Sequence, residues 1–118
     1  MWTTAVRCAS EVMRLSELQP KFIVIEKSNA QRREVDEMSV AHGLMFMCPR
    51  CLRMSAERRH SVVCWFSDRM VPEWEMPTWA RWAVSGSGYG DITIDGVIAV
   101  RGGCRWRGRV RNGRIVVP

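Results

Sequence analysis

The sequence predicts a small, mainly antiparallel β domain with one or two short helices, a fold class indicated by two observations. Three short apolar runs, at residues 22–25, 44–47 and 61–66, have the length and the side chains of buried strands. Two dipeptides, Asp95-Gly96 and Asn112-Gly113, supply the positive φ angles that two-residue hairpin turns require. Successive hairpins of this kind predict a β meander, so the domain is expected to be α+β with zinc-ribbon-like hairpins.

The composition is that of one folded domain covering residues 1–118. Hydrophobic residues make up 47% of the chain and charged residues 25%, a mixture that lies outside the range of disordered chains. No stretch approaches the roughly 20 apolar residues of a membrane span. Residues 1–10 lack the apolar core of a signal peptide. We therefore expect a cytoplasmic protein without a membrane partner.

The N-terminal residues 1–20 are expected to be helical, ahead of a β-rich body at residues 21–118. Four apolar residues lie near helical spacing there: Trp2, Val6, Ala9 and Met13. Pro20 ends this pattern because it cannot continue a helix. The polar residues 26–39 that follow the first strand predict an exposed loop or a short surface helix.

Two hairpins are predicted in the last thirty residues. Residues 91–94 are expected to pair with residues 97–100 around Asp95-Gly96, and residues 101–117 to form a basic hairpin around Asn112-Gly113. The net charge of +6 resides in this second hairpin, because the last 18 residues contain six arginines and no acid. The C-terminal hairpin is therefore a local basic feature that could meet an anionic partner.

The cysteines favour a metal site over disulfide bonds. There are five: Cys8, Cys48, Cys51, Cys64 and Cys104. An odd number in a reducing compartment favours free thiols or metal ligands. Cys48 and Cys51 have the two-residue gap that lets two thiolates face one tetrahedral ion from a tight turn, as in a zinc-ribbon knuckle. Cys104 is the natural candidate for a second knuckle.

The spacing leaves the fourth ligand undetermined. A second knuckle would place it at Arg107, which stays protonated and has no lone pair to offer. Four other donors are available: His60, Cys64, His42 and Cys8. Of these, Cys64 falls on the apolar face of a predicted strand, which favours a buried thiol. Two interpretations stand: zinc bound by the three cysteines and a fourth donor, or thiols that pack without metal. A redox pair is less favoured, because no βαβ pattern surrounds the cysteines.

Four stretches of the chain, taken together, carry a resemblance. They are LSELQPKF (15–22), HGLMFMCP (42–49), Trp82 with SGSGYGDITI (85–94), and CRWRG (104–108) with Asn112-Gly113. In this order they resemble a family of small phage and prophage proteins that is known only as a domain of unknown function. The resemblance implies a phage or mobile-element origin, hence the host cytoplasm, and a metal site at Cys48, Cys51 and Cys104. Similar sequences have Cys-x-Trp-His-Gly at the second knuckle, so this chain departs from the pattern at Arg107.

Arginine alternates along the C-terminal segment. On a strand, Arg105, Arg107, Arg109 and Arg111 would share one face, with Arg114 following the turn. Their guanidinium groups would stand about 6 to 7 Å apart, close to the distance between adjacent phosphates of a nucleic-acid strand. Such a row of like charges is costly unless an anion offsets it. We expect it to bind nucleic acid or an acidic host protein, the alternative being that the arginines only protect a sheet edge from aggregation.

The tryptophans divide into two expected groups. Trp65 and Trp106 are expected in the core, as is usual in small β proteins. Three others could stack on bases or anchor a protein contact: Trp74, Trp79 and Trp82.

No catalytic constellation is apparent. The sequence assembles no nucleophile with its base, no paired carboxylates and no His-Glu-x-x-His run, so the protein is not expected to be an enzyme. The leading hypothesis is a non-catalytic, phage-type binding protein whose basic hairpin engages nucleic acid. The alternative hypothesis is a host-directed inhibitor, such as a counter-defence protein, that acts by protein contact.

Overall fold

The computed structural model describes residues 13–26, 31–52, 59–67, 69, 71–72, 74–75, 80–100 and 104–116. Within these residues two sheets form, and all their strand pairs are antiparallel, which confirms the predicted fold class. In spatial order the five-stranded sheet contains β1 (Met13–Arg14), β9 (Arg114–Val116), β8 (Arg107–Arg111), β7 (Thr93–Ala99) and β6 (Val84–Ser85). The four-stranded sheet contains β3 (Arg32–Val35), β2 (Lys21–Ile25), β4 (Gly43–Met47) and β5 (Ser61–Trp65).

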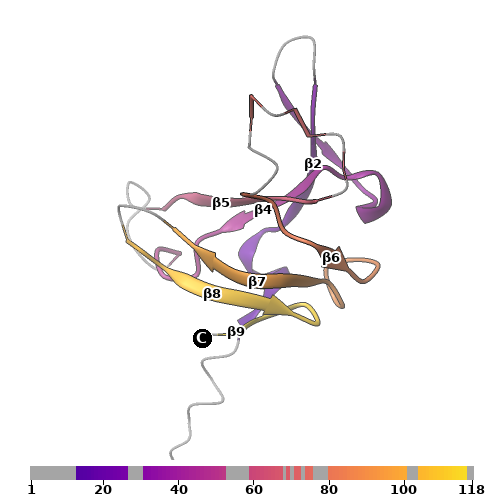
Figure 1. The fold of residues 1–118 in the computed structure, drawn as a ribbon. Coiled ribbons are helices and arrows are strands. Elements are labelled where there is room, and N and C mark those ends of the chain that lie inside the picture. The colour runs from indigo at the N-terminus through magenta and orange to yellow at the C-terminus, as the bar shows by residue number, and fades with distance from the viewer. Residues whose placement is uncertain are drawn as a thin grey trace, which may run out of the picture.

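The main core lies between the two sheets, which face each other in Figure 1. The alternate residues of each strand that point inward are buried there, as the pleat of a strand requires. From the four-stranded sheet these include Leu44, Phe46, Val62 and Cys64, and from the five-stranded sheet Ile94, Ile98, Val110 and Ile115. Trp106 joins this core and Trp65 is also buried, so both predictions for these tryptophans are confirmed.

Strand β2 is buried on both faces, which explains its continuous apolar run. Phe22 belongs to the core between the sheets, whereas Ile23 and Ile25 pack with Trp65 and Val71 in a second cluster on the opposite face. Val71, which follows β5 in the chain, covers part of this outer face. An apolar run without alternation is typical of a strand enclosed in this way.

Helix is limited to two single 3-10 turns, η2 (Leu15–Leu18) and η3 (Met38–Val40). Residues 1–12 of the predicted N-terminal helix lie outside the described residues, and Met13–Arg14 is a strand. Leu15 and Leu18 are buried together, because side chains three residues apart align in a 3-10 turn. No helix of the described residues is long and apolar enough to cross a membrane.

The prediction of a hairpin around Asp95-Gly96 was wrong. These residues lie inside the continuous strand β7, which pairs with both β6 and β8. Gly96 does adopt a positive φ of 111°. It lies, however, where the register between β7 and β8 shifts, between Ile94 and Ile98, and not at a turn. A glycine with positive φ suits a bulge as well as a turn. The dipeptide alone does not distinguish the two.

Two further predictions can be compared with the structure. The hairpin around Asn112-Gly113 is confirmed: it joins β8 to β9, and both turn residues have positive φ, 49° and 73°. The expected loop or surface helix at residues 26–39 instead contains strand β3. Its side chains are mostly exposed, and it sits at the edge of its sheet beside β2. Backbone pairing with β2 forms this strand without an apolar pattern.

Candidate metal centre

Four side chains of the kinds that can ligate a metal meet at one end of the two sheets. Their donor atoms, the Sγ atoms of Cys48, Cys51 and Cys104 and a ring nitrogen of His60, all lie within 4.8 Å of one another. The Sγ atoms of Cys48 and Cys104 are 3.5 Å apart, and Nε2 of His60 is 3.2 Å from Sγ of Cys104. The four side chains are thus close enough to hold a metal ion.

Cys48 and Cys51 are placed by a tight turn at the end of β4. The backbone N–H groups of Cys51 and Leu52 both donate to the carbonyl oxygen of Cys48, at 3.2 and 3.0 Å. This turn brings both thiols to the same side, as the two-residue gap predicts. The three predicted cysteines are therefore brought together, and the knuckle has the expected form.

His60 reaches the cluster through the pairing of β4 with β5. Met47 is opposite Ser61, so the residues just beyond them, Cys48 and His60, also face each other. The backbone N–H of Cys48 donates to the carbonyl oxygen of His60 at 2.9 Å. The fourth donor thus comes from the strand that neighbours the knuckle, and not from position 107.

The donor set fits a tetrahedral ion. With metal–sulfur bonds of about 2.3 Å, tetrahedral ligand atoms stand about 3.8 Å apart. The observed separations of 3.5 and 3.2 Å are slightly shorter, so a small outward movement of Cys104 would accommodate an ion. Three thiolates and one imidazole make a closed Cys3His set, the composition of structural zinc sites.

The thiols differ in acidity. Burial raises the pKa of Cys48 to about 11 and also raises the pKa of Cys51. Burial acts in the same direction on Cys104, but hydrogen bonds from the Trp106 backbone, His60 and the other two thiols outweigh it and lower the pKa of Cys104 to about 7. The Cys104 thiol is therefore partly ionised near neutral pH, which favours a cation beside it.

The cluster connects the two sheets. Cys48, Cys51 and His60 flank β4 and β5 of the four-stranded sheet, whereas Cys104 precedes β8 of the five-stranded sheet. Arg50, between the two knuckle cysteines, donates from Nη1 to the carbonyl oxygen of Cys104 at 2.6 Å. No motif or spacing predicts this contact, which connects the knuckle to the start of the arginine-rich segment.

The other candidate ligands do not join the cluster. Cys64 is fully buried in the core between the sheets, as predicted, and burial raises its pKa to about 12. Nδ1 of His42 accepts a hydrogen bond from the backbone N–H of Ile25 at 3.0 Å. Cys8 lies outside the described residues. Arg107 is exposed on β8, on the face opposite the core.

Strand β8 presents alternate arginines, as expected, but it is shorter than predicted. Arg107, Arg109 and Arg111 point away from the core, while Gly108 and Val110 are buried. Arg105 is exposed but precedes the strand, because its backbone adopts a left-handed φ of 55° and breaks the alternation. Arg101 lies outside the described residues.

Exposed arginines also lie side by side on neighbouring strands of the five-stranded sheet. Arg111 on β8 is directly opposite Arg114 on β9, and Arg114 is directly opposite Arg14 on β1. Residues directly opposite in an antiparallel sheet share a face. We name the five arginines 14, 107, 109, 111 and 114 the arginine face. Sequence reasoning missed Arg14, which is one hundred residues away from Arg114.

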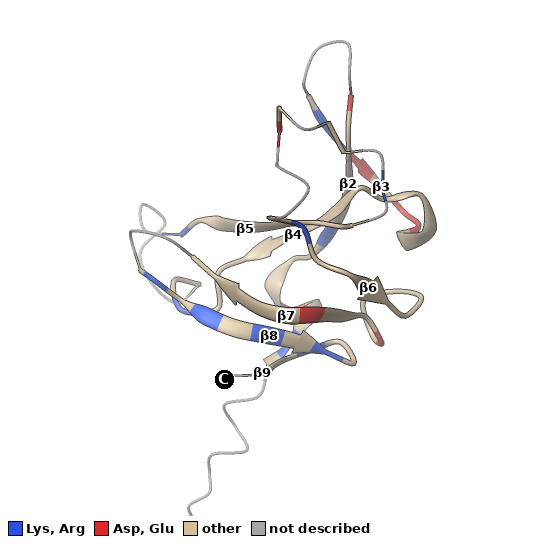
Figure 2. Ribbon diagram, in the orientation of Figure 1, with Lys and Arg blue, Asp and Glu red and all other residues tan. Residues whose placement is uncertain are grey.

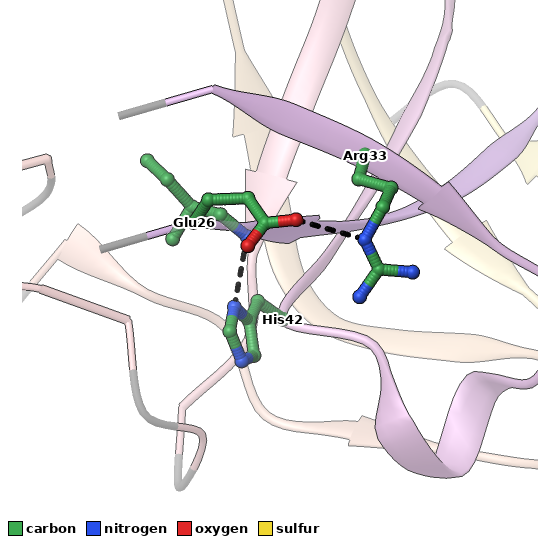
Figure 3. A network of polar contacts seen from close by, with 4 residues as sticks. Glu26, Arg33 and His42 are labelled. Atoms are coloured by element: carbon green, nitrogen blue, oxygen red, sulfur yellow. Dashed lines mark hydrogen bonds and ion pairs between the residues drawn. The ribbon is translucent and has the colours of Figure 1, made fainter. Parts of the chain in front are cut away.

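The arginine face has no ion-pair partner in the part of the chain that the structure describes. The arginines of β3 behave differently: Arg32 pairs with Glu75 at 3.4 Å, and Arg33 pairs with Glu26 at 2.9 Å. Figure 3 shows Glu26 between Arg33 and His42. In Figure 2 blue bands cross β8, while red gathers along β3 and the turn after it. The strand β7 beside the face contains one exposed acid, Asp95.

Comparisons with protein-family models, with curated proteins and with solved structures found no match. The functional interpretation therefore depends on the geometry of the chain itself.

Proposed function

We propose that this protein is a non-catalytic nucleic-acid-binding protein, in which a zinc ion held by Cys48, Cys51, His60 and Cys104 fixes the start of β8, the strand that carries three arginines of the arginine face. The observation that supports binding is the row of arginines 111, 114 and 14 on three adjacent strands, without an ion-pair partner among the described residues. Zinc is favoured over other metals because three thiolates and one imidazole suit it best.

The zinc ion would have a structural role. Four protein ligands leave no open position for water or substrate, whereas catalytic zinc keeps one. The ion would join the knuckle after β4 to the residue that precedes β8 by three positions. Its energy of binding would stabilise the folded chain, because an unfolded chain has no preformed site. The closed ligand set therefore favours a structural role for the ion over a catalytic one.

The arginine face would bind the nucleic-acid backbone. Arginines at alternate positions of β8 stand about 6 to 7 Å apart, similar to successive phosphates. Like charges directly opposite each other destabilise a sheet, so an anion that bridges them would relieve repulsion as it binds. Contacts of this kind are independent of base sequence.

The test is the salt dependence of binding to a single-stranded oligonucleotide. The logarithm of the association constant falls with the logarithm of the salt concentration, by about 0.7 for each phosphate contact. Changing Arg109→Ser and Arg111→Ser together should reduce this slope by about 1.4. The matched control is Arg32→Ser with Arg33→Ser, which removes the same charge from β3 and should leave the slope unchanged. Equal slopes for all three proteins would contradict the proposal.

The resemblance to small phage proteins supports a phage origin and a second candidate, a host-directed inhibitor that binds protein. One observation favours it: Trp74 is 60% exposed, and an exposed tryptophan is a frequent anchor of protein interfaces. Capture of a host protein that survives nuclease treatment, and that is lost on Trp74→Ala, would support this candidate. Capture that disappears with nuclease would favour nucleic acid.

A further inference from the structure

A hollow of about 310 Å³ lies beside the turn between β8 and β9. It is lined by Arg14, Ser16, Gly90, Asn112, Gly113 and Arg114. This volume is at the lower end of the range of about 300 to 1,000 Å³ that small-molecule sites occupy. The lining contains two guanidinium groups, a hydroxyl and a side-chain amide, and it contains no carboxylate. The chemistry of the hollow is therefore that of an anion site.

Two acids adjoin lining residues in the sequence, Glu17 beside Ser16 and Asp91 beside Gly90, and both already accept backbone hydrogen bonds. Oδ1 of Asp91 accepts from the backbone N–H groups of Ser87 and Gly88, at 2.9 and 2.8 Å. Glu17, in η2, accepts a hydrogen bond through Oε1 from the backbone N–H of Arg14 at 2.9 Å. No ion pair joins it to the guanidinium of Arg14 or of Arg114 within the described residues. The two arginines are directly opposite each other on β1 and β9, so their charges repel until an anion lies between them.

Backbone hydrogen bonds join the chain segments that line the hollow. The N–H of Leu15 donates to the carbonyl oxygen of Gly113, and the N–H of Gly113 donates to that of Ile92, both at 2.8 Å. Gly113 also packs against the backbone of Gly90 so closely that a Cβ atom would collide with it. These contacts fix the backbone positions from which the side chains of Arg14, Asn112 and Arg114 line the hollow.

We infer that this hollow binds a phosphoryl group, held by Arg14 and Arg114 with help from Ser16 and Asn112. Guanidinium groups recognise phosphate oxygens through paired hydrogen bonds, and hydroxyl and amide donors complete the set. The inference rests on the proposed function, because a nucleic-acid strand bound along β8 would reach this turn, where Arg114 and Arg14 continue the arginine face. The phosphoryl group comes either from the terminal phosphate of such a strand or from a small phosphate ion.

The experiment compares the affinities of one single-stranded oligonucleotide with a phosphate at the 5′ end, at the 3′ end and at neither end. Calorimetry with inorganic phosphate is the fourth arm. The wild type is expected to prefer one phosphorylated form or to bind inorganic phosphate. The double change Arg14→Gln and Arg114→Gln should reduce that preference, or the affinity for phosphate, by at least about tenfold. Arg32→Gln with Arg33→Gln is the control and should retain both.

The four measurements distinguish the two possible sources of the phosphoryl group. They also distinguish failure of this inference from failure of the proposed nucleic-acid binding. A preference for a phosphorylated end identifies a strand terminus as the source. Binding of inorganic phosphate without a preference among the three oligonucleotides identifies a small anion. If the wild type binds all three oligonucleotides equally and does not bind phosphate, the inference is overturned and the proposed function stands. If it binds neither oligonucleotide nor phosphate, both are overturned. A preference that persists in the Arg14→Gln and Arg114→Gln protein also overturns the inference.

Discussion

Nε2 of His60 lies 3.2 Å from Sγ of Cys104, although the two residues adjoin strands of different sheets. His60 precedes β5 in the four-stranded sheet, and Cys104 precedes β8 in the five-stranded sheet. Their approach completes the set of four donors that Cys48 and Cys51 begin. A metal ion at this point would act as a crosslink between the sheets, with consequences for stability that can be measured.

The first prediction concerns removal of the metal. A ligand that binds only the folded chain stabilises it by about 4 kcal/mol when its free concentration is a thousand times its dissociation constant. We therefore expect the melting temperature to rise with free zinc and to fall when a chelator is added. His60→Ala should melt at a lower temperature and should no longer respond to chelator. Calorimetric or fluorescence melting with and without chelator measures both effects.

The control for that prediction is a change at His42, the histidine that lies outside the cluster. His42→Ala removes an acceptor for the backbone N–H of Ile25 and should lower stability modestly, by about 1 to 3 kcal/mol. It should nevertheless keep the full response to zinc and chelator, because His42 is not part of the cluster. An identical response to chelator in wild type and His60→Ala would show that the four donors do not hold the metal.

The second prediction concerns pH and the buried thiol of Cys64. Burial raises its pKa from the usual 9.0 to about 12, so the folded state requires the neutral thiol. This contribution to stability is complete below pH 9 and is lost as the pH rises from 9 towards 12. Over that range the wild type should lose roughly 1 kcal/mol of unfolding free energy per pH unit more than Cys64→Ala does. Denaturant unfolding of both proteins at several alkaline pH values checks it, and parallel losses would refute it.

The third prediction concerns Gly108, which lies between Arg107 and Arg109 on β8. The indole ring of Trp106 lies against Gly108, so a Cβ atom at that position would collide with the ring. The same ring meets Phe46 edge to face, with centroids 6.1 Å apart. Gly108→Ala should therefore displace Trp106 and lower the unfolding free energy by about 1 to 3 kcal/mol.

Gly88 provides the matched control. A Cβ atom there would have no neighbour within 4 Å, and Gly88 does not have a positive φ. Gly88→Ala should therefore change stability by no more than about 0.5 kcal/mol. Urea unfolding followed by tryptophan fluorescence measures both variants. A loss for Gly88→Ala as large as that for Gly108→Ala would show that the contact with Trp106 is not the cause.

The fold was predictable where side-chain pattern and turn chemistry agree. The apolar runs that became β2, β4 and β5 and the turn at Asn112-Gly113 were recognised for this reason. Strand β3 was missed, because a polar edge strand depends on backbone pairing and leaves no apolar pattern. Asp95-Gly96 was assigned to a turn, because the positive φ of a glycine serves a bulge equally well.

The candidate site was predictable only in part. The two-residue gap between Cys48 and Cys51 predicts the first knuckle, and Cys104 is the expected candidate for the second. The register of the β4–β5 pair adds a signal for His60 that the cysteine spacing does not contain. Pairing Met47 with Ser61 places His60 opposite Cys48. Arg14 offered no such signal, since its neighbour Arg114 lies one hundred residues away and β1 has two residues. Contacts between distant segments depend on how the whole chain packs.

Native mass spectrometry of the purified protein, before and after addition of a short single-stranded oligonucleotide, tests the central claim most directly. The account predicts one zinc ion per chain, and a complex with the oligonucleotide that retains this zinc and dissociates as salt is raised. Folded chain without metal would contradict the zinc centre. Zinc-bound chain that forms no complex with the oligonucleotide would contradict the proposed binding by the arginine face.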